Sequence, residues 1–301
     1  MTEYADEMVP RRLRPGQRAE VWIAEVGGGS AELAYATETL LLEAPNWTPD
    51  GHGLLLNGDG LLWRLDLEPH VDLTKVPIED LPPINNDHVL DAARGLIYLS
   101  ANDGHIYVAP IEGGTAKRVT DDSSCYHFLH GVSPDGSTLA FVELPRADLS
   151  VPARLALLSS SGGETRYPEA GSSHLDGPEY SPDGAWLYFN TEEFGSQAGH
   201  AQLARMPAEG GHLEHLVESE TVDWFPHLSP NGDLASYISF PPGTLGHPPD
   251  LDVEVRLVRT ANWRECVWRF PLLGGQGTIN VNSWSPDSRR FAFVAYPVQQ
   301  A

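Results

Sequence analysis

A four-residue turn, Ser-Pro-Asp-Gly or a close variant of it, recurs along this chain of 301 residues. A repeat of this kind constrains the fold strongly, because each copy marks one small structural unit and neighbouring units must stack to bury a common core. The copies lie at residues 48–51, 133–136, 181–184, 229–232 and 285–288. The sequence therefore predicts a repeat architecture, and the spacing of the copies decides how many units it has.

The spacing of the turn prolines indicates six units. Pro134, Pro182, Pro230 and Pro286 are separated by 48, 48 and 56 residues. The gap of 85 residues from Pro49 to Pro134 has room for two units, and a degenerate turn without proline falls at residues 91–95. The second unit is thus expected to be degenerate and not absent.

Short runs rich in aromatic and β-branched residues follow the turns. Residues 139–142, 186–189 and 291–296 are examples, and none has helical spacing. Further runs of the same kind end in Gly-rich turns, which brings each unit to four strands. Four strands repeated every 40 to 56 residues or so are typical of a propeller blade. We therefore predict an all-β fold, a six-bladed β-propeller of four-stranded blades.

The two ends of the chain carry complementary parts of one blade. Residues 20–28 have the pattern of a third strand and its Gly turn, whereas residues 284–296 supply a first and a second strand. A last blade shared between the termini would close the ring and remove exposed sheet edges. We expect residues 20–297 to form a single propeller domain, preceded by an N-terminal tail of residues 1–19.

The net charge limits which partners are expected, and the first twenty residues indicate the cellular compartment. With 42 acidic and 19 basic side chains, the formal charge of -23 would repel a phosphate backbone, so nucleic acid is not expected as a partner. The first twenty residues contain four Arg and no apolar core, which predicts no signal peptide, no membrane span and a cytoplasmic location. Cys125 and Cys266 lie in different repeats and fit two reduced thiols.

Polar segments rich in His, Asp and Asn precede most of the turns. In a propeller the first strand of each blade lines the central channel, so these segments are expected to converge at one mouth of that channel. The Pro-Asp-Gly turns would then lie on the opposite face with a structural role. His88 and His130 each stand four residues before the anchor position of their unit, which predicts that both lie at one height.

Imidazole, amide and carboxylate groups from separate blades suit a divalent cation such as Mn²⁺, Zn²⁺ or Ca²⁺. His88, His227 and Gln276 are the candidate ligands; the alternative is that the histidines are hydrogen-bonded within their blades. His227 stands only three residues before Pro230, so it faces the mouth only if its strand bulges.

His130 is the candidate general base, and Asp176 or Asp223 would orient it. His247 and Asp250 come from a long loop at residues 241–252, and such a loop at a functional mouth often forms a pocket wall. The aromatic candidates either floor a sugar pocket or fill the core. The full set of candidate substrate-binding residues is Asn86, Asp87, Tyr126, Trp224, His247, Asp250 and Asn282.

The Pro-Asp-Gly turn, the aromatic strand after it and the Gly-Gly turn together resemble the repeats of TolB-type six-bladed propellers. The closer resemblance is to small stand-alone cytoplasmic TolB-like proteins, and it is carried by the segments at residues 85–88, 130–131, 176–178, 223–227 and 274–278. More distantly, the His and Gln candidates resemble the metal cluster of oligogalacturonate lyases, which are seven-bladed. That resemblance implies uronate substrates, which would need Arg146, Arg154 or Arg256 nearby; without them a neutral or oxidised sugar is equally credible.

Two functional hypotheses follow from the mouth. The first is a soluble carbohydrate-active enzyme, a lyase or hydrolase that acts on a sugar or oligosaccharide with a divalent cation. The alternative is a non-catalytic scaffold that holds a protein or peptide partner at the same mouth. The chain has neither a Gly-x-Ser-x-Gly elbow nor a nucleotide-binding Gly loop.

Overall fold

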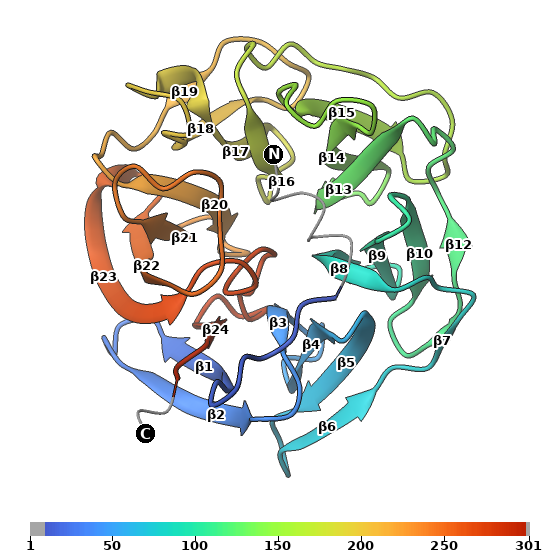
Figure 1. Cartoon of the computed structure of the whole chain (residues 1–301), viewed down its shortest axis with the longest axis vertical. Helices are drawn as coiled ribbons and strands as arrows, with labels where there is room; N and C mark the ends of the chain where they lie inside the picture. Colours follow the sequence, from blue (N-terminus) through green and yellow to red (C-terminus); the bar gives the residue numbers. More distant parts are fainter. Residues whose placement is uncertain (1–9, 299–301) are drawn as a thin grey trace.

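Six antiparallel sheets stand in a ring in the computed structural model, which describes residues 10–298 (Figure 1). The predicted all-β, six-bladed β-propeller is thereby confirmed. The strands of each blade are given from the axis outward. Blade 1 contains β3 (Glu43–Trp47), β4 (Gly53–Gly58), β5 (Leu61–Asp66) and β6 (Asp72–Lys75), and blade 2 contains β8 (Ile84–Asp91), β9 (Leu96–Ala101), β10 (Ile106–Pro110) and β12 (Lys117–Arg118). Blade 3 contains β13 (Cys125–Val132), β14 (Thr138–Pro145) and β15 (Arg154–Ser159), blade 4 contains β16 (Leu175–Tyr180), β17 (Trp186–Thr191), β18 (Gln202–Pro207) and β19 (Glu214–His215), and blade 5 contains β20 (Val222–Leu228), β21 (Leu234–Phe240), β22 (Leu251–Arg259) and β23 (Asn262–Gly274).

The sixth blade joins the two ends of the chain, as predicted. Its order is β24 (Arg290–Ala295), β1 (Ala19–Glu25) and β2 (Ala31–Thr37), with Glu20 to Glu25 paired antiparallel to Ala295 to Arg290. A single bridge between Trp284 and Phe291 takes the place of its inner strand. Blade 3 likewise has three strands and one bridge, between Leu157 and Arg166, so four full strands occur in blades 1, 2, 4 and 5.

Two small elements lie outside the six blades. A short parallel pair, β7 (Ile78–Glu79) with β11 (Gly114–Thr115), links blades 1 and 2, and one turn of 3-10 helix, η1 (Glu192–Phe194), follows β17. Within residues 10–298 there is no helix long and apolar enough to span a membrane.

The Pro-Asp-Gly turns have the structural role that their composition predicts. Asp135 accepts hydrogen bonds from the Ser133 hydroxyl at 2.6 Å and from the Ser137 backbone N–H at 3.0 Å. Gly136 has φ of +70°, a conformation that a residue with a Cβ adopts at a cost. The degenerate turn is stabilised in the same way, because Asp91 accepts a hydrogen bond from the Arg94 backbone N–H at 3.1 Å.

Buried apolar side chains form six clusters, one at each interface between successive blades. At the interface of blades 5 and 6, for example, Phe291 and Phe293 of β24 pack with Ile238 and Val255. Each such side chain contributes about 1.5–3 kcal/mol relative to an exposed position. The blades are therefore held together by their faces, and the polar residues at the axis are not needed as core.

Part of the predicted tail packs on the propeller. Residues 1–9 lie outside the described residues, but the backbone N–H of Arg18 donates to the Pro297 carbonyl at 3.1 Å and Gln17 bridges to Val298. Farther toward the N-terminus, Pro10 and Arg11 lie at the channel mouth.

Candidate functional site

The inner strands of blades 1 to 5 each contain a β-bulge where the sequence becomes polar. The register shifts lie between Glu43 and Asn46, Ile84 and His88, Leu129 and Gly131, Asp176 and Glu179, and Trp224 and His227. A bulge inserts a residue and redirects the neighbouring side chains, so strict alternation is lost. Phe225 has φ of +54° at one of these bulges. The strand of His227 thus does bulge, which was the condition for its facing the channel.

Side chains around the bulges enclose a cavity of about 60 Å³ at this mouth. That volume holds a few water molecules and is too small for a sugar ring. Six of the predicted site residues line it: Asn86, Asp87, His130, Asp176, His247 and Gln276. The polar segments of blades 2, 3 and 4, the loop of residues 241–252 and the closing blade therefore do converge.

A buried cluster of one imidazole and two carboxylates forms the centre of the cavity. His130 Nε2 lies 3.0 Å from Asp176 Oδ1 and 4.0 Å from Asp87 Oδ1. The other ring nitrogen, Nδ1, faces the Asn280 carbonyl at 3.4 Å, and the ring stacks on Phe225 with centroids 5.6 Å apart. His130 is only 4% exposed, so this charge cluster is shielded from solvent.

The environment shifts the pKa values of the three groups in different directions. Burial alone would lower the pKa of His130, but the carboxylates of Asp87 and Asp176 outweigh it and raise that pKa to about 9. Burial likewise opposes ionisation of Asp176, yet contact with His130 lowers its pKa to about 2. Burial dominates at Asp87, which is farther from the imidazole, and raises its pKa to about 7. At neutral pH His130 is therefore an acid, Asp176 a carboxylate, and Asp87 a group that can take up or release a proton.

A chain of amides adjoins this cluster. Gln276 Nε2 donates to Asn86 Oδ1 at 3.1 Å, and Gln276 Oε1 accepts from Asn280 Nδ2 at 3.4 Å and from His247 Nδ1. His247 packs on Trp224, with ring centroids 4.5 Å apart, and its Nε2 lies 3.8 Å from Asp176 Oδ2. Burial lowers the pKa of His247 to about 4, so this ring is neutral at pH 7.

The N-terminal segment closes the mouth. Pro10 and Arg11 line the cavity, and the Arg11 guanidinium pairs with Glu43 and donates to the Gln276 carbonyl at 2.8 Å. Behind it, Arg14 pairs with Asp250 at 2.8 Å. A ligand larger than a few waters can enter only if this segment, which is held by ion pairs, moves.

Three predicted residues lie deeper along the axis. His227 Nδ1 is 2.7 Å from Glu179 Oε2 and its Nε2 donates to the Ile279 carbonyl at 2.6 Å. Asn282 donates to Glu179 Oε1 at 2.8 Å and lines the opposite mouth. His88 donates from Nδ1 to Asn46 Oδ1 at 2.7 Å. These residues connect neighbouring blades, so His88 and His227 are hydrogen-bonded between blades and not within their own blade as the alternative expected.

The predicted metal ligands do not fit a common cation as they are arranged. Both ring nitrogens of His227 are engaged, and Gln276 Oε1 already accepts two hydrogen bonds. His88 Nε2 is buried without a hydrogen-bond partner among residues 10–298, but one free imidazole nitrogen does not make a metal site. Over the same part of the chain, no three His, Cys, Asp or Glu side chains lie together so that they could hold a metal ion.

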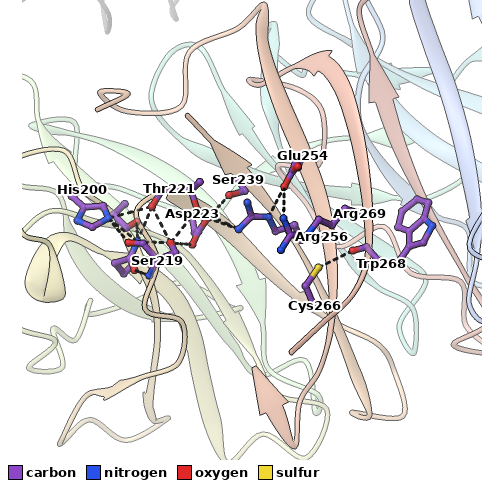
Figure 2. Close-up of polar contacts among 12 residues, drawn as sticks. His200, Ser219, Thr221, Asp223, Ser239, Glu254, Arg256, Cys266, Trp268 and Arg269 are labelled. Atoms are coloured by element: carbon purple, nitrogen blue, oxygen red, sulfur yellow. Dashed lines mark hydrogen bonds and ion pairs between the residues drawn. The ribbon is translucent and has the colours of Figure 1, made fainter. Parts of the chain in front are cut away.

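Asp223 lies inside blade 5 and does not line the cavity. Its carboxylate accepts from the hydroxyls of Ser219 at 2.7 Å, Thr221 at 3.0 Å and Ser239 at 2.6 Å (Figure 2). Of the two carboxylates proposed to orient His130, the structure brings only Asp176 within reach.

Three other candidate substrate-binding residues also lie outside the cavity lining. Trp224 is 1% exposed and packs beneath His247, so it is core. Tyr126 lies under the Arg146 guanidinium, 4.2 Å from its ring centroid. Asp250 accepts from Gln17 Nε2 at 2.5 Å and anchors the N-terminal segment.

The arginines expected near a uronate are engaged elsewhere. Arg146 donates to the Cys125 carbonyl at 3.1 Å, Arg154 pairs with Glu143 at 3.0 Å and Arg256 pairs with Glu254 at 2.8 Å. None of the three lines the cavity, where Arg11 is present instead.

Sequence reasoning missed Arg11, Glu43 and Asn280. Glu43 lies five residues before the first turn, where the later units carry their polar segments, so the repeat itself could have indicated it. Asn280 follows the segment at residues 274–278 by two positions, and its residue type alone did not mark it. Arg11 had no signal, because it precedes the repeats.

Buried His88 makes a testable contribution to acid sensitivity. Burial lowers its pKa from 6.5 to about 3, so between these values the unfolded chain binds a proton that the folded protein excludes. Stability therefore falls as the pH drops through this window, by about 1.4 kcal/mol per pH unit for this one residue. In His88→Gln we expect the free energy of unfolding to depend less steeply on pH between 6 and 4, by about that amount. Urea titrations across this range measure it, and parallel curves for the two proteins would contradict the assignment.

Together these features define a six-bladed β-propeller with a buried acid–base cluster at one mouth of its channel. No protein-family model matches the chain. The uncharacterized protein Atu1656 of Agrobacterium fabrum is 39% identical over 264 residues, which span 86% of this chain and 86% of that protein. A solved structure from Agrobacterium tumefaciens, provisionally described as a TolB, has a TM-score of 0.85 and 35% identity and covers 94% of this chain and 99% of its own. The chain belongs to this family of TolB-like six-bladed propellers.

More distant structures share only the fold. TolB from Acinetobacter baumannii has a TM-score of 0.63 at 17% identity and covers 89% of this chain and 66% of its own. An oligogalacturonate lyase in complex with manganese has a TM-score of 0.54 at 13% identity and covers 86% and 74%. The resemblances noted in the sequence are thus confirmed at the level of the fold.

Proposed function

We propose that this propeller is an acid–base enzyme that cleaves a C–O bond of a sugar or oligosaccharide at the closed mouth. The observation that carries the proposal is the buried cluster of His130, Asp176 and Asp87. A charged imidazole with an ionised partner and a second carboxyl of pKa about 7 is a costly arrangement to bury. Such perturbed groups are concentrated at functional sites.

The pKa values assign the roles differently from the sequence. His130 carries its proton at neutral pH, so it is the general acid that protonates the leaving oxygen, and Asp176 holds the ring in place. Asp87, with a pKa of about 7, is the general base. In an elimination Asp87 removes a proton next to a carbonyl; in a hydrolysis it removes one from water. Either reaction needs this one acid and one base.

The cavity lining suits a neutral or weakly charged sugar. Side-chain amides both donate and accept hydrogen bonds, as hydroxyl groups do, and the lining contains Asn57, Asn85, Asn86, Asn102, Gln276 and Asn280. Phe128, which is partly exposed, offers an aromatic face against which a sugar ring can stack. Among the described residues that line the cavity, Arg11 is the single guanidinium, and Glu43 already neutralises it. The substrate is expected to displace residues 10–14 from the mouth.

Turnover of a panel of neutral, oxidised and uronate oligosaccharides tests the proposal, with product masses as the readout. Elimination leaves the summed product mass equal to that of the substrate, whereas hydrolysis adds one water. We expect activity to rise with pH around 7, as Asp87 ionises, and to fall around 9, as His130 loses its proton. Asp87→Asn should lower kcat about 10²–10⁴-fold and remove the acidic limb of the profile.

The matched control is Asp223→Asn, the same change at a buried carboxylate outside the cavity, which should retain turnover. EDTA or added Mn²⁺, Ca²⁺ or Zn²⁺ separates this reaction from the metal-dependent version, and loss of turnover in EDTA would favour the latter. If the wild-type protein neither turns over nor binds any member of the panel, the enzyme proposal is wrong.

The second candidate is a scaffold for a protein or peptide partner, and the opposite mouth favours it. A cavity of about 500 Å³ opens there between the prolines of the repeated turns, including Pro49, Pro134 and Pro182. Its walls include Trp47 and Trp284, which suit an apolar peptide. If the protein turns over none of the sugars, this opposite mouth becomes the site to test for a protein or peptide partner.

A further inference from the structure

A second polar cavity lies on the outer part of blade 5, beside blade 4. Its volume is about 310 Å³, and it shares no lining residue with the cavity at the channel mouth. Tyr237 of β21 and Arg256 of β22 form one side, and Arg264, Cys266 and Arg269 of β23 form the other. Figure 2 shows Arg256, Arg269 and Cys266 grouped on these strands.

Three guanidinium groups meet in this cavity although the chain is strongly acidic. The chain has 19 basic residues against 42 acidic ones, yet Arg256, Arg264 and Arg269 all line the one space. Arg256 and Arg269 are direct cross-strand neighbours, and like charges in that position destabilise a sheet. Arg264 and Arg269 are exposed, so water screens part of this repulsion, and an anion bound between them would remove more of it.

The carboxylates of the protein supply only part of that compensation. Glu254 serves two arginines, at 2.8 Å from Arg256 and 3.7 Å from Arg269. Asp223 is 4.0 Å from Arg256, but its oxygens already accept three hydroxyl hydrogen bonds.

The ion pairs of this region within residues 10–298 involve Arg256 and Arg269 and not the exposed Arg264, and Glu218 is the one carboxylate in the cavity lining. The guanidinium N–H donors of Arg264 and Arg269 thus remain available to a ligand. Their planar geometry matches the two oxygens of a carboxylate or phosphate.

The rest of the lining suits the organic part of a ligand. Trp263 is 6% exposed and stacks on Tyr188 with centroids 5.7 Å apart, so its position is fixed. Val217 and the ring of Tyr237 add apolar surface. A cavity of this kind accepts a small molecule more readily than an extended macromolecule.

We propose that this cavity of blade 5 binds a small organic molecule that carries a phosphate or carboxylate group, with Arg264 and Arg269 as its principal ligands. The site is independent of the channel mouth and of the sugar chemistry proposed there. A phosphate and a carboxylate would use the same guanidinium donors, so the choice between them is left to the test.

Phenyl phosphate, benzoate and neutral benzyl alcohol are the probes, titrated in a phosphate-free buffer at constant ionic strength. The indole N–H signals of the eight tryptophans report binding in a ¹H–¹⁵N spectrum, and Trp263→Phe assigns the one in the cavity. We expect saturable shifts of the Trp263 signal with at least one anion and none with benzyl alcohol. The stronger anion identifies the oxyanion class.

Arg264→Gln and Arg269→Gln should each weaken binding at least fivefold. The matched control is Arg259→Gln, on β22 but outside the lining, which should bind within twofold of wild type. The same spectrum shows whether each variant is folded. The proposal is overturned if no anion gives a saturable shift, if benzyl alcohol binds as well as the anions, or if Arg259→Gln weakens binding as much as the cavity variants.

Discussion

Replacing His130 with alanine is expected to lower the free energy of unfolding by about 3–5 kcal/mol at neutral pH, because it removes the cation from a buried charge cluster. Asp176, whose side chain is 13% exposed, would lose its partner at 3.0 Å, and burial would then oppose its ionisation. Asp87, at 4.0 Å, would lose the same charge. Urea unfolding followed by tryptophan fluorescence measures the difference between variant and wild type.

His105→Ala is the matched control for this change. His105 is also a buried imidazole, at 5% exposure, but its ring bonds the hydroxyls of Thr120 and Ser123 and no carboxylate. Its replacement should cost about 1–3 kcal/mol, the range for buried hydrogen-bonded groups. Combining His130→Ala with Asp176→Asn should recover part of the loss, since residues in direct contact do not contribute additively. Equal losses for His130→Ala and His105→Ala would show that the ion pair of His130 stabilises the protein no more than the hydrogen bonds of His105 do.

The fold could be predicted from the sequence because its signals are local and repeated. Each turn is stabilised by its own residues: in residues 133–136 the Ser133 hydroxyl donates to Asp135, and Gly136 adopts the positive φ that the turn needs. The spacing of those turns sets the number of blades, and the half-blades at the two ends indicate closure. Each of these features depends on neighbours in the sequence, so none needed knowledge of a distant contact.

The candidate site was only partly predictable because bulges decide which side chains face the cavity. Asp176 and Asp223 hold comparable positions before their turns, yet Asp176 precedes Gly177, which has φ of +66°, and it faces His130. Asp176 is the last paired residue before its bulge, whereas Asp223 lies one residue earlier in its strand, opposite Ser239, and stays within its blade. The residue types alone do not show where a strand bulges or which side chain then faces the cavity.

Roles were harder to predict than positions. His130 was assigned as a base from its residue type, but two carboxylates from other blades raise its pKa to about 9. Arg11 lies 32 residues from its partner Glu43, and no periodicity connects them. Charge and protonation at the mouth thus depend on contacts that only the assembled ring creates.

Glu179 is expected to be the other position where a single substitution has a large effect on stability. It links three blades at the axis: from β16 it accepts His227 Nδ1 at 2.7 Å, the Leu228 backbone N–H at 2.9 Å and Asn282 Nδ2 at 2.8 Å. Glu179→Ala would remove the acceptor of the buried Leu228 N–H and the partner of His227 Nδ1, whereas Asn282 Nδ2 would keep the Leu228 carbonyl at 2.9 Å. Each unsatisfied buried donor costs about 1–3 kcal/mol, so we expect a loss of about 3–5 kcal/mol after partial relaxation.

Two further variants separate the charge of Glu179 from its shape and from carboxylates in general. Glu179→Gln keeps one acceptor but presents an N–H₂ group to His227, so an intermediate loss is expected. Glu214→Ala removes a carboxylate that is 41% exposed in its pair with Arg205, and it should cost no more than about 1 kcal/mol. Chemical denaturation of the four proteins orders them as wild type, Glu214→Ala, Glu179→Gln and Glu179→Ala. If Glu179→Ala unfolds at the same urea concentration as Glu214→Ala, the axis is not held by this carboxylate, and the apolar interfaces between blades alone keep the ring closed.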